Sequence, residues 1–264
     1  MEILGFSKEE RHQIILKQLS KKNYIKVKDL AEKLNVSMET VRQDLSFLEE
    51  ELKLKKVHGG ATRMKEQGLE LYFSKRIQHN RKIKIAMAAA ASDLIESGET
   101  IGIGSGTTAL HIVEHLKGKE MLTVITSSIP VLNQLVELKA ENEFHGEVYF
   151  IGGKVNSELL STSGSLTEKM LKDIYLDKFF FSCDGFTEEG IFAHNSNEGL
   201  LSQLYLKHAA RSVLLADSSK LNQKNFIKIT NFSRIDTIIT DSKCSKKYEE
   251  VVLESGIEWI SIEK

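Results

Sequence analysis

The sequence predicts an α/β protein in two parts, an N-terminal winged helix-turn-helix followed by a mostly parallel, open α/β sheet domain. Three observations predict it. Two short amphipathic helices and a longer third one come first, a basic stretch with a glycine pair follows, and apolar strands then alternate with amphipathic helices. The expected boundaries are residues 1–61 for the winged helix, 62–74 for a linker and 75–264 for the sheet domain.

Charge is distributed unevenly along the chain. Residues 1–65 carry 14 Lys and Arg against 10 Asp and Glu, whereas residues 66–264 carry 22 against 27. A basic end on an acidic body favours contact with a polyanion. Two cysteines suggest neither a disulfide framework nor a metal cluster, and neither a signal peptide nor an apolar run of roughly 18 residues stands out. We therefore expect a cytoplasmic protein without a membrane partner.

The first two helices are predicted by their ends. Ser7 precedes Glu10 by three residues, which is the spacing of a capping box at the start of a helix. Ile15 and Leu19 then share one face of this helix. The segment "VKDLAEKL" is a second short helix, and Asn35 after it suits the left-handed residue that ends a helix.

The third helix, "METVRQDLSFLEEEL", has an apolar stripe at Val41, Leu45, Leu48 and Leu52. The side chains that face away from the stripe can hydrogen-bond base edges or phosphates. A recognition helix reads DNA with its N-terminal residues. The residues expected to contact DNA from this helix are Ser37, Glu39, Thr40, Arg42 and Gln43.

A basic hairpin follows the third helix. Residues 53–65 contain five Lys or Arg and no acidic residue, and Gly59 and Gly60 suit a tight turn between two short strands. Such a wing can lie against the DNA backbone. Its expected contact residues are Lys55, Lys56 and His58. A plain three-helix bundle with solvated charges is the structural alternative, and the basic hairpin favours DNA binding over it.

The rest of the chain predicts a parallel sheet covered on both faces. A long helix is expected over roughly 75–97, ended by Gly98. Apolar strands such as "TIGIG", "LTVIT" and "SVLLAD" then alternate with amphipathic helices. Five of these strands end in glycines, hydroxyls, a carboxylate or lysines. Because ligands of such sheets bind beyond the carboxyl ends of the strands, these ends predict one site.

The loop in "IGIGSGTTALHIVEH" has four interpretations. A P-loop requires a lysine after Gly106, which the chain lacks. "GSGTTA" fits a dinucleotide fingerprint, but the next strand ends in serines and not in the acid that holds a ribose. His111 and His115 with Glu114 match an inverted zinc-protease motif, although two surface histidines are the simpler interpretation. Lastly, backbone N–H groups and hydroxyls can surround a phosphate at a helix N-terminus, and the other strand ends favour this interpretation.

The segment "VSMETVRQDLSFLE" followed by "KKVHGGA" resembles the winged helix of the DeoR family of bacterial transcriptional repressors. The segments "RKIKIAMAAA", "IGIGSGTT", "TVITSS", "FIGGKV", "DKFFFSCDGF", "NSNEG" and "LLADSSK" follow in the order of that family's effector-sensing domain, which is similar to ribose-5-phosphate isomerase. The chain departs from the family pattern at Gln43, where a second arginine is usual. It also departs at Gly102 or Gly104 and at Ser127, where an Asp and an Asn are usual.

The resemblance implies a sugar-phosphate site at the strand ends. The implied phosphate contacts are Ser105, Gly106, Thr107 and Thr108, with Lys220 adding positive charge. The residues implied to line the sugar are Ser127, Gly152, Gly153, Asp184 and Glu198. We expect no catalytic residue, no cofactor and no metal.

The combined features favour a DNA-binding transcriptional regulator, a repressor of a carbohydrate or sugar-alcohol operon. Its partners would be operator DNA, a phosphorylated sugar or sugar alcohol, and further copies of the chain in a homo-oligomer. The alternative is a sugar-phosphate isomerase or hydrolase with an accessory DNA-binding domain, in which Asp184 or Glu198 would serve as general base.

Overall fold

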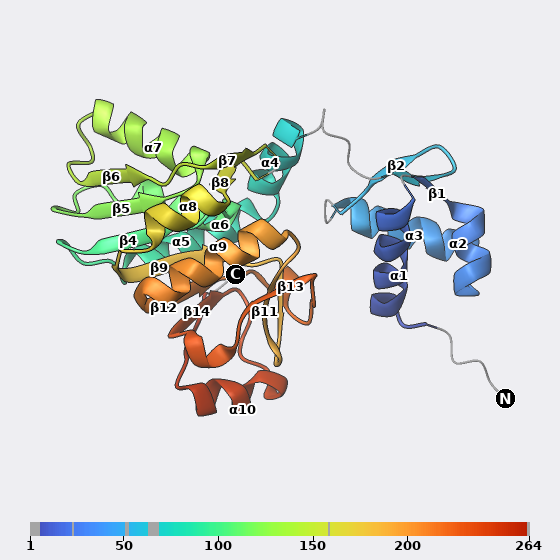
Figure 1. The fold of residues 1–264 in the computed structure, drawn as a ribbon. Helices are drawn as coiled ribbons and strands as arrows, with labels where there is room; N and C mark the ends of the chain where they lie inside the picture. The colour runs from blue at the N-terminus through green and yellow to red at the C-terminus, as the bar shows by residue number, and fades with distance from the viewer. Residues whose placement is uncertain (1–5, 23, 51–52, 63–68, 158, 263–264) are drawn as a thin grey trace. The chain divides into compact units, whose positions relative to one another are not determined.

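The computed structural model describes residues 6–22, 24–50, 53–62, 69–157 and 159–262. The chain forms two compact units, Met1–Arg76 and Ile77–Lys264. Figure 1 shows the helices and strands of each unit. Within the described ranges, no helix is both long and apolar enough to cross a membrane.

In the first unit, the described residues between 6 and 62 form three helices and a small antiparallel sheet of order β1-β3-β2 (Figure 1), and most of α4 (Leu69–Gln78) also belongs to this unit. The strands β2 and β3 form the predicted wing. The strand β1 was not predicted, because three residues between two helices carry too little pattern. Its elements are α1 (Lys8–Lys21), β1 (Tyr24–Lys26), α2 (Val27–Leu34), α3 (Met38–Glu50), β2 (Lys55–Val57) and β3 (Gly60–Thr62).

The predicted caps of this unit are confirmed. The Glu10 N–H donates to Ser7 Oγ, and the Ser7 N–H donates to Glu10 Oε2, at 3.2 and 2.8 Å. Asn35 adopts a left-handed φ of 51° after α2. A Cβ at Gly60 would lie 2.1 Å from the Ile25 carbonyl oxygen, so glycine there lets β1 approach β3. The core of the unit includes Ile15, Leu19, Leu30, Leu34, Val41, Leu45 and Leu48; Leu52 lies outside the described residues.

The second unit is built around a parallel sheet with helices on both faces. Its helices are α5 (Arg81–Ser92), α6 (Thr107–Leu110), α7 (Ile129–Ala140), α8 (Ser165–Leu171), α9 (Ser196–His208) and α10 (Lys246–Ser255), with short 3-10 turns η2 (His111–His115), η3 (Ser218–Lys220) and η4 (Phe232–Arg234). The strands of the sheet are β4 (Thr100–Ile103), β5 (Thr123–Thr126), β6 (Glu147–Phe150), β9 (Leu176–Ser182), β12 (Ala209–Leu215), β14 (Thr237–Thr240) and β15 (Glu258–Ser261).

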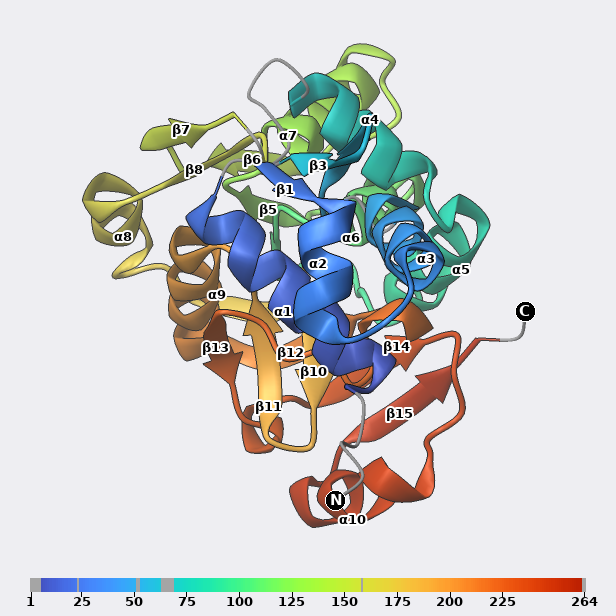
Figure 2. The same cartoon turned by 90° about the vertical axis from the view of Figure 1, so that its right-hand side faces the viewer.

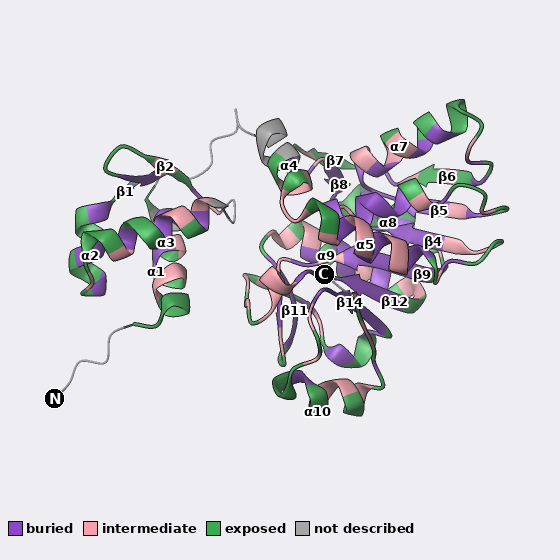
Figure 3. Cartoon of the chain, turned by 180° about the vertical axis from the view of Figure 1, so that it is seen from behind, coloured by how far each residue is buried: buried purple, intermediate pink, exposed green. Residues whose placement is uncertain are grey.

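The seven strands have the order β15-β14-β12-β9-β4-β5-β6, and every adjacent pair is parallel. In Figure 1, α9 lies in front of the sheet and α5 behind it. The strand β14, most of β9 and the second half of β12 are buried, as their purple colour in Figure 3 shows. Such burial on both faces explains their continuous apolar sequences. Figure 2 shows α10 beside β15 at the C-terminal end of this unit.

Short antiparallel strands lie outside the parallel sheet. None of them was predicted from the sequence. Strands of three or four residues are too short for a period of two to stand out. They form a hairpin, β7-β8, and a three-stranded sheet of order β10-β11-β13. Their bounds are β7 (Lys154–Asn156), β8 (Ser161–Ser163), β10 (Gly185–Thr187), β11 (Gly190–Ala193) and β13 (Ile227–Thr230).

The single long helix predicted over 75–97 is wrong. Two helices occupy this region, α4 (Leu69–Gln78) and α5, which ends at Ser92 and not near Gly98. The break falls at Asn80, whose left-handed φ of 55° no helix can continue through. The helix α4 begins inside the range expected to be the linker, and residues 63–68 lie outside the described part.

Candidate functional site

The polar strand ends lie along the carboxyl edge of the parallel sheet. The strand β4 pairs with β5, the next strand in the sheet, on one side and with β9, which comes much later in the chain, on the other. The winding direction therefore reverses between β4 and β9. Ligands of open α/β sheets bind at such a switch point. The loop at residues 104–106 and residues 183–184 leave the sheet at this point.

The loop after β4 lies against the end of β9. A Cβ at Gly106 would lie 2.4 Å from Ser182 Oγ, so only glycine allows this approach. Thr107 and Thr108 are buried, with 3% and 5% of their surfaces exposed. The helix that follows, α6, has four residues, so the helix expected behind the loop is a single turn. Its dipole is correspondingly small, and side chains must supply most of the charge for any anion.

Lys84 places a positive charge beside this loop, and the sequence analysis did not identify it. It lies in the first turn of α5 with 5% of its surface exposed, and its Nζ donates to Thr107 Oγ1 at 3.1 Å. A signal for it does exist in the sequence. Lys84 precedes the buried Met87, Ala88 and Ala91 by three, four and seven residues, so it falls on the buried face of the helix.

Asp217, two residues after the end of β12, is a buried carboxylate near two lysines. Burial alone would raise the pKa of Asp217, but Lys220, hydrogen bonds from Ser219 and Lys84 together lower it. The carboxylate is therefore ionised at neutral pH and partly neutralises both lysines. Its Oδ1 also lies 3.5 Å from Asn80 Nδ2. Because Asp217 interacts with both Lys220 and Lys84, the predicted residue Lys220 belongs to the same polar cluster as Lys84.

The two predicted carboxylates take up different positions. Ser105 Oγ donates to Glu198 Oε1 at 2.9 Å, so Glu198, in the first turn of α9, is joined to the loop after β4. Asp184 follows β9 and accepts the His194 N–H at Oδ2, at 2.7 Å. Both carboxylates are half-buried, which leaves each able to accept hydrogen bonds from hydroxyl groups of a ligand.

The residues predicted after β5 and β6 lie beside the β7-β8 hairpin. Ser127 is 1% exposed, and its carbonyl accepts the Thr162 N–H at 2.9 Å. The Gly152 carbonyl accepts from Thr167 Oγ1 at 2.8 Å, and a Cβ at Gly153 would lie 2.1 Å from that same hydroxyl oxygen. Within the described ranges, no hydrogen bond joins Gly152 or Gly153 to the loop after β4. They lie at the same edge, beyond the end of another strand.

Two buried hydroxyl groups at this edge have no hydrogen-bond partner among the described residues. Ser182 ends β9 and Thr240 ends β14. Buried polar groups in native proteins nearly always have a partner, which is protein, water or ligand. The unsatisfied hydroxyls therefore mark the same edge as the lysines and the glycine loop.

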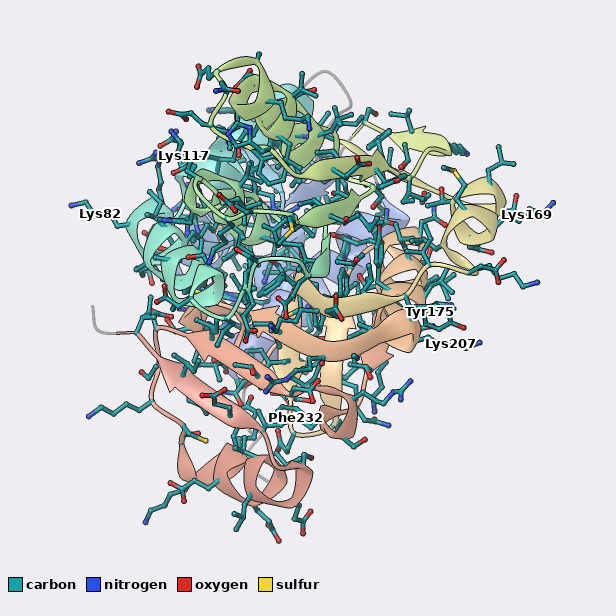
Figure 4. All side chains as sticks on the ribbon, turned by 90° about the vertical axis from the view of Figure 1, so that its left-hand side faces the viewer. Lys82, Lys117, Lys169, Tyr175, Lys207 and Phe232 are labelled. Atoms are coloured by element: carbon teal, nitrogen blue, oxygen red, sulfur yellow. The ribbon has the colours of Figure 1, made fainter. Side chains whose placement is uncertain are left out.

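A groove of about 440 Å³ lies at the opposite, amino-terminal edge of the sheet. Figure 4 labels Tyr175 and Lys207, which lie close together there and line it. Asp177 at this edge is already bonded to the Thr100 N–H. No wall residue of the groove has an unsatisfied buried side-chain atom in the described part of the chain. The chemistry therefore favours the carboxyl edge.

The prediction that His111 is a surface residue is wrong. Only 3% of His111 is exposed, because η2 packs against α5, and its Nδ1 lies 3.2 Å from Glu114 Oε1. No group of three or more metal-binding side chains occurs among the described residues. His111 is therefore part of the packing of this turn.

The predicted DNA-contacting residues of α3 lie at its exposed N-terminal end. Ser37 caps the helix, because its Oγ accepts the Thr40 N–H at 3.0 Å. Arg42 Nη1 and Glu39 Oε2 form an exposed ion pair at 3.1 Å, with 55% and 66% of their side chains accessible. Gln43 is exposed beside them. Arg42 and Gln43 therefore present hydrogen-bonding groups to the outside, and Glu39 orients Arg42.

The wing is attached to α3 through one of its lysines. The Lys56 N–H donates to Glu49 Oε1 and its Nζ donates to Ser46 Oγ, both at 2.7 Å. Lys56 is thereby half-buried, whereas Lys55 and His58 are exposed. Lys55 and His58 are therefore the predicted contact residues of the wing that remain exposed to solvent.

A buried carboxylate joins α3 to α1. Asp44 is 2% exposed, and it accepts from Arg11 Nε at 2.7 Å and from Arg11 Nη2 at 3.0 Å. His12 Nε2 lies 3.1 Å from the same carboxylate. Because Asp44 lies one turn from Thr40, these bonds hold the recognition helix against α1. The sequence does not reveal this ion pair, because Arg11 and Asp44 are 33 residues apart and no spacing links them.

A winged helix followed by a parallel sheet with a polar carboxyl edge defines a class of protein. It is a DNA-binding protein with a separate domain suited to binding a small ligand. Comparison with known families agrees for both parts. The "DeoR-like helix-turn-helix domain" matches residues 11–67, and the "DeoR C terminal sensor domain" matches residues 77–242. The chain belongs to the DeoR family of transcriptional regulators.

Named relatives span almost the full chain. The HTH-type transcriptional regulator GolR of Listeria innocua is 35% identical over 94% of this chain and 96% of its own. The lactose phosphotransferase system repressor of Staphylococcus epidermidis is 33% identical over 97% of this chain and 100% of its own. Ribose 5-phosphate isomerase A of Methanocaldococcus jannaschii matches 55% of this chain and 56% of its own, at 20% identity and a TM-score of 0.40.

These named sequence relatives are regulators and repressors. The chain is accordingly a DNA-binding transcriptional regulator and not an enzyme. Burial raises the pKa of Cys183 at the sheet edge, so its thiol is protonated and carries no nucleophilic charge there.

Proposed function

We propose that this regulator represses a carbohydrate or sugar-alcohol catabolic operon, and that a phosphorylated sugar bound at the carboxyl edge of the sheet controls its affinity for the operator. One observation carries the proposal. The Lys84 ammonium, 5% exposed, donates to Thr107 Oγ1 within the glycine and hydroxyl loop. A cation buried beside hydroxyl and backbone donors is suited to a phosphate dianion.

The proposed ligand contacts divide by chemistry. The phosphate would be held by the loop after β4 together with the two lysines, namely Ser105, Gly106, Thr107, Thr108, Lys84 and Lys220. The carboxylates of Asp184 and Glu198 would accept hydrogen bonds from sugar hydroxyls. Ser127, Gly152 and Gly153 would line the sugar from the neighbouring strand ends. Relatives named as lactose phosphotransferase system repressors support a phosphorylated sugar.

The proposed DNA contacts come from α3 and the wing. Arg42 and Gln43 would reach base edges, with Thr40, Ser37 and Glu39 at the start of the helix. Lys55, Lys56 and His58 would contact the phosphate backbone. We further propose that residues 1–61 form the DNA-binding domain, that residues 75–264 form the effector domain, and that the regulator binds as a homo-oligomer. A symmetric operator would then pair with a symmetric protein.

The effector acts by binding one state of the regulator better than the other. If it prefers the state with low operator affinity, operator binding weakens by the same coupling free energy. Typical couplings of about 1–3 kcal/mol change affinity roughly 5–150-fold. The coupling is a property of the complete chain, because the two sites belong to different units.

The effector assignment is tested with the operator region upstream of this gene, labelled for fluorescence anisotropy. A panel of sugar phosphates is titrated beside the same sugars without phosphate. We expect at least one phosphorylated compound to weaken operator binding about tenfold or more, and its unphosphorylated partner to have no effect. The Thr107→Val variant should lose this response, whereas Thr123→Val at the amino end of β5 should retain it.

Two outcomes would contradict the effector assignment. If no phosphorylated compound changes operator affinity, the sensing role fails. If Thr107→Val responds like the wild type, the ligand binds elsewhere.

The DNA assignment is tested by the salt dependence of operator binding. Each phosphate contact contributes a slope of about −0.9 to log K against log salt. The Lys55→Gln variant should therefore lose about one unit of slope, because Lys55 is exposed on the wing. Lys172→Gln changes an exposed lysine of the sheet unit and serves as the control. An unchanged slope in Lys55→Gln would remove the wing from the DNA interface.

A further inference from the structure

The junction between α4 and α5 touches the proposed effector site twice. Asn80 interrupts the two helices with a left-handed φ of 55°, and its side chain does not cap α5. Its Nδ2 lies instead 3.5 Å from Asp217 Oδ1. One turn later, Lys84 donates to Thr107 Oγ1 in the glycine and hydroxyl loop. The segment from Asn80 to Lys84 is thus bonded to two of the strand ends that would hold the ligand.

The same segment is the part of the sheet unit that leads back toward the winged helix. α4 ends at Gln78, two residues before Asn80, and the chain N-terminal to α4 continues to the DNA-binding unit. The boundary between the two units falls after Arg76, within α4, so a displacement of Asn80 would act on the helix in which the first unit ends. Residues at the ends of elements commonly absorb the dihedral changes of hinges.

The charges around Asp217 make its contact with Asn80 sensitive to an anion. Asp217 is ionised, and its pKa is lowered by Lys220, by hydrogen bonds from Ser219 and by Lys84, against the effect of burial. A phosphate at the loop after β4 would attract the same two lysines. Asp217 would then lose part of its counter-charge and be repelled by the phosphate. The contact with Asn80, at the long limit of a hydrogen bond, is weak enough to break in response.

We propose that Asn80 and Asp217 form the link through which effector binding is communicated to the α4–α5 junction, and hence to the DNA-binding unit. This inference rests on the proposed function of the carboxyl edge. Asn80 acts as a positioning residue: it does not touch the ligand, and it sets the junction according to the state of Asp217. The Asp217 carboxylate is displaced by competition for Lys84 and Lys220, so no covalent step is involved.

The test uses Asn80→Gly in the full-length protein. Glycine tolerates the left-handed conformation and removes the whole side chain, with the amide group that contacts Asp217. The matched control is Asn142→Gly, since Asn142 also has a positive φ of 59° and follows α7. Inorganic phosphate is the probe of the site, with binding measured by equilibrium dialysis and operator affinity by anisotropy in the same buffer. Thermal melting checks that each variant is folded.

We expect wild type and Asn142→Gly to lose operator affinity about tenfold at saturating phosphate. Asn80→Gly should bind phosphate within twofold of wild type, match its operator affinity without phosphate, and change that affinity less than twofold when phosphate is added. Hydrogen exchange at residues 79–84 should rise with phosphate in wild type and stay constant in Asn80→Gly. A purely structural role for Asn80 would lower the melting temperature without changing the ratio of the two operator affinities.

The outcomes separate the two proposals. If Asn80→Gly responds to phosphate like wild type, the link is overturned and the effector site stands. If phosphate binds to wild type without changing its operator affinity or the exchange at residues 79–84, the link is likewise overturned. If wild type does not bind phosphate at all, the link and the proposed effector site both fail.

Discussion

The two units hold their proposed functional side chains in opposite ways. The winged helix leaves Arg42, Gln43 and Lys55 exposed, whereas the sheet unit buries Lys84 and Thr107 to 5% and 3% exposure. The difference follows from the ligands that these surfaces suit. DNA is a large polyanion that a protein meets with an open face, and a small phosphorylated molecule is held by groups that surround it. Substitutions should therefore affect binding alone in the first unit and both binding and stability in the second.

The strongest exception to this comparison is Asp44, and its removal should have the largest effect. Asp44→Ala leaves Arg11 without a partner for two of its hydrogen bonds. Breaking a buried ion pair in this way costs about 3–5 kcal/mol, and the first unit should unfold at lower urea concentration. Circular dichroism would show this early transition. Trp259, the only tryptophan, lies in the sheet unit, so its fluorescence transition should not move.

The control for Asp44 is Glu39→Ala, on the same helix but 66% exposed at its side chain. Its free energy of unfolding should stay within about 0.5 kcal/mol of wild type. Equal effects of the two variants would mean that Asp44 does not hold α3 against α1.

The next largest effect is expected from Lys84→Met. This change removes the hydrogen bond to Thr107 and one counter-charge of Asp217. Hydrogen bonds from charged groups contribute about 1.5–3 kcal/mol. The free energy of unfolding measured from Trp259 fluorescence should therefore fall by that amount. Lys82→Met is the matched control, because Lys82 lies on the same helix with its side chain extending away from the ribbon in Figure 4. If both variants unfold alike, the burial of charge at this edge has no energetic consequence.

Local chemistry explains which features the sequence predicted. The Ser7 capping box and the Asn35 stop depend on residues three or four apart, and both are confirmed. The order of strands and helices in the sheet unit was likewise visible, because buried parallel strands are continuous apolar runs. The helix break at Asn80 was not predicted, because a single asparagine between two helical segments is only a weak signal against a helix.

Tertiary contacts explain what the sequence did not predict. Lys84 approaches Thr107 across 23 residues, and Ser182 approaches Gly106 from a strand that comes much later in the chain. Neither proximity follows from a spacing or a motif. The strand ends predicted a site at the carboxyl edge of a sheet, and that site stays a prediction; the buried cation and the unsatisfied hydroxyls at this edge became visible only in the fold.

Arg42→Ala tests the comparison in the winged helix, where substitutions should affect binding alone. The Arg42 side chain is 55% exposed and, within the described part of the chain, pairs only with Glu39, so stability should change by no more than about 0.5 kcal/mol. Operator binding should nevertheless weaken by about 1–3 kcal/mol at constant salt, as expected for an arginine that reads a base. Anisotropy and urea unfolding of the same sample test both halves. Arg234→Ala, exposed in the sheet unit, should change neither, and a matching loss of operator affinity there would make the effect non-specific.

The smallest effect is expected from His12, and it depends on pH. Burial lowers the pKa of His12, and the hydrogen bond and charge of Asp44 oppose this only in part. The unfolded state, with a histidine pKa of about 6.5, binds the proton more readily than the folded state. The contribution of His12 is therefore fully present above pH of about 6.5 and is lost as pH falls from there through the lower folded pKa. The circular-dichroism transition of the first unit should shift to lower urea between pH 7.5 and 5.5, and His12→Gln should reduce the shift. A wild-type transition that does not move, or one that moves equally in His12→Gln, would show that the proton is taken up elsewhere in the unit.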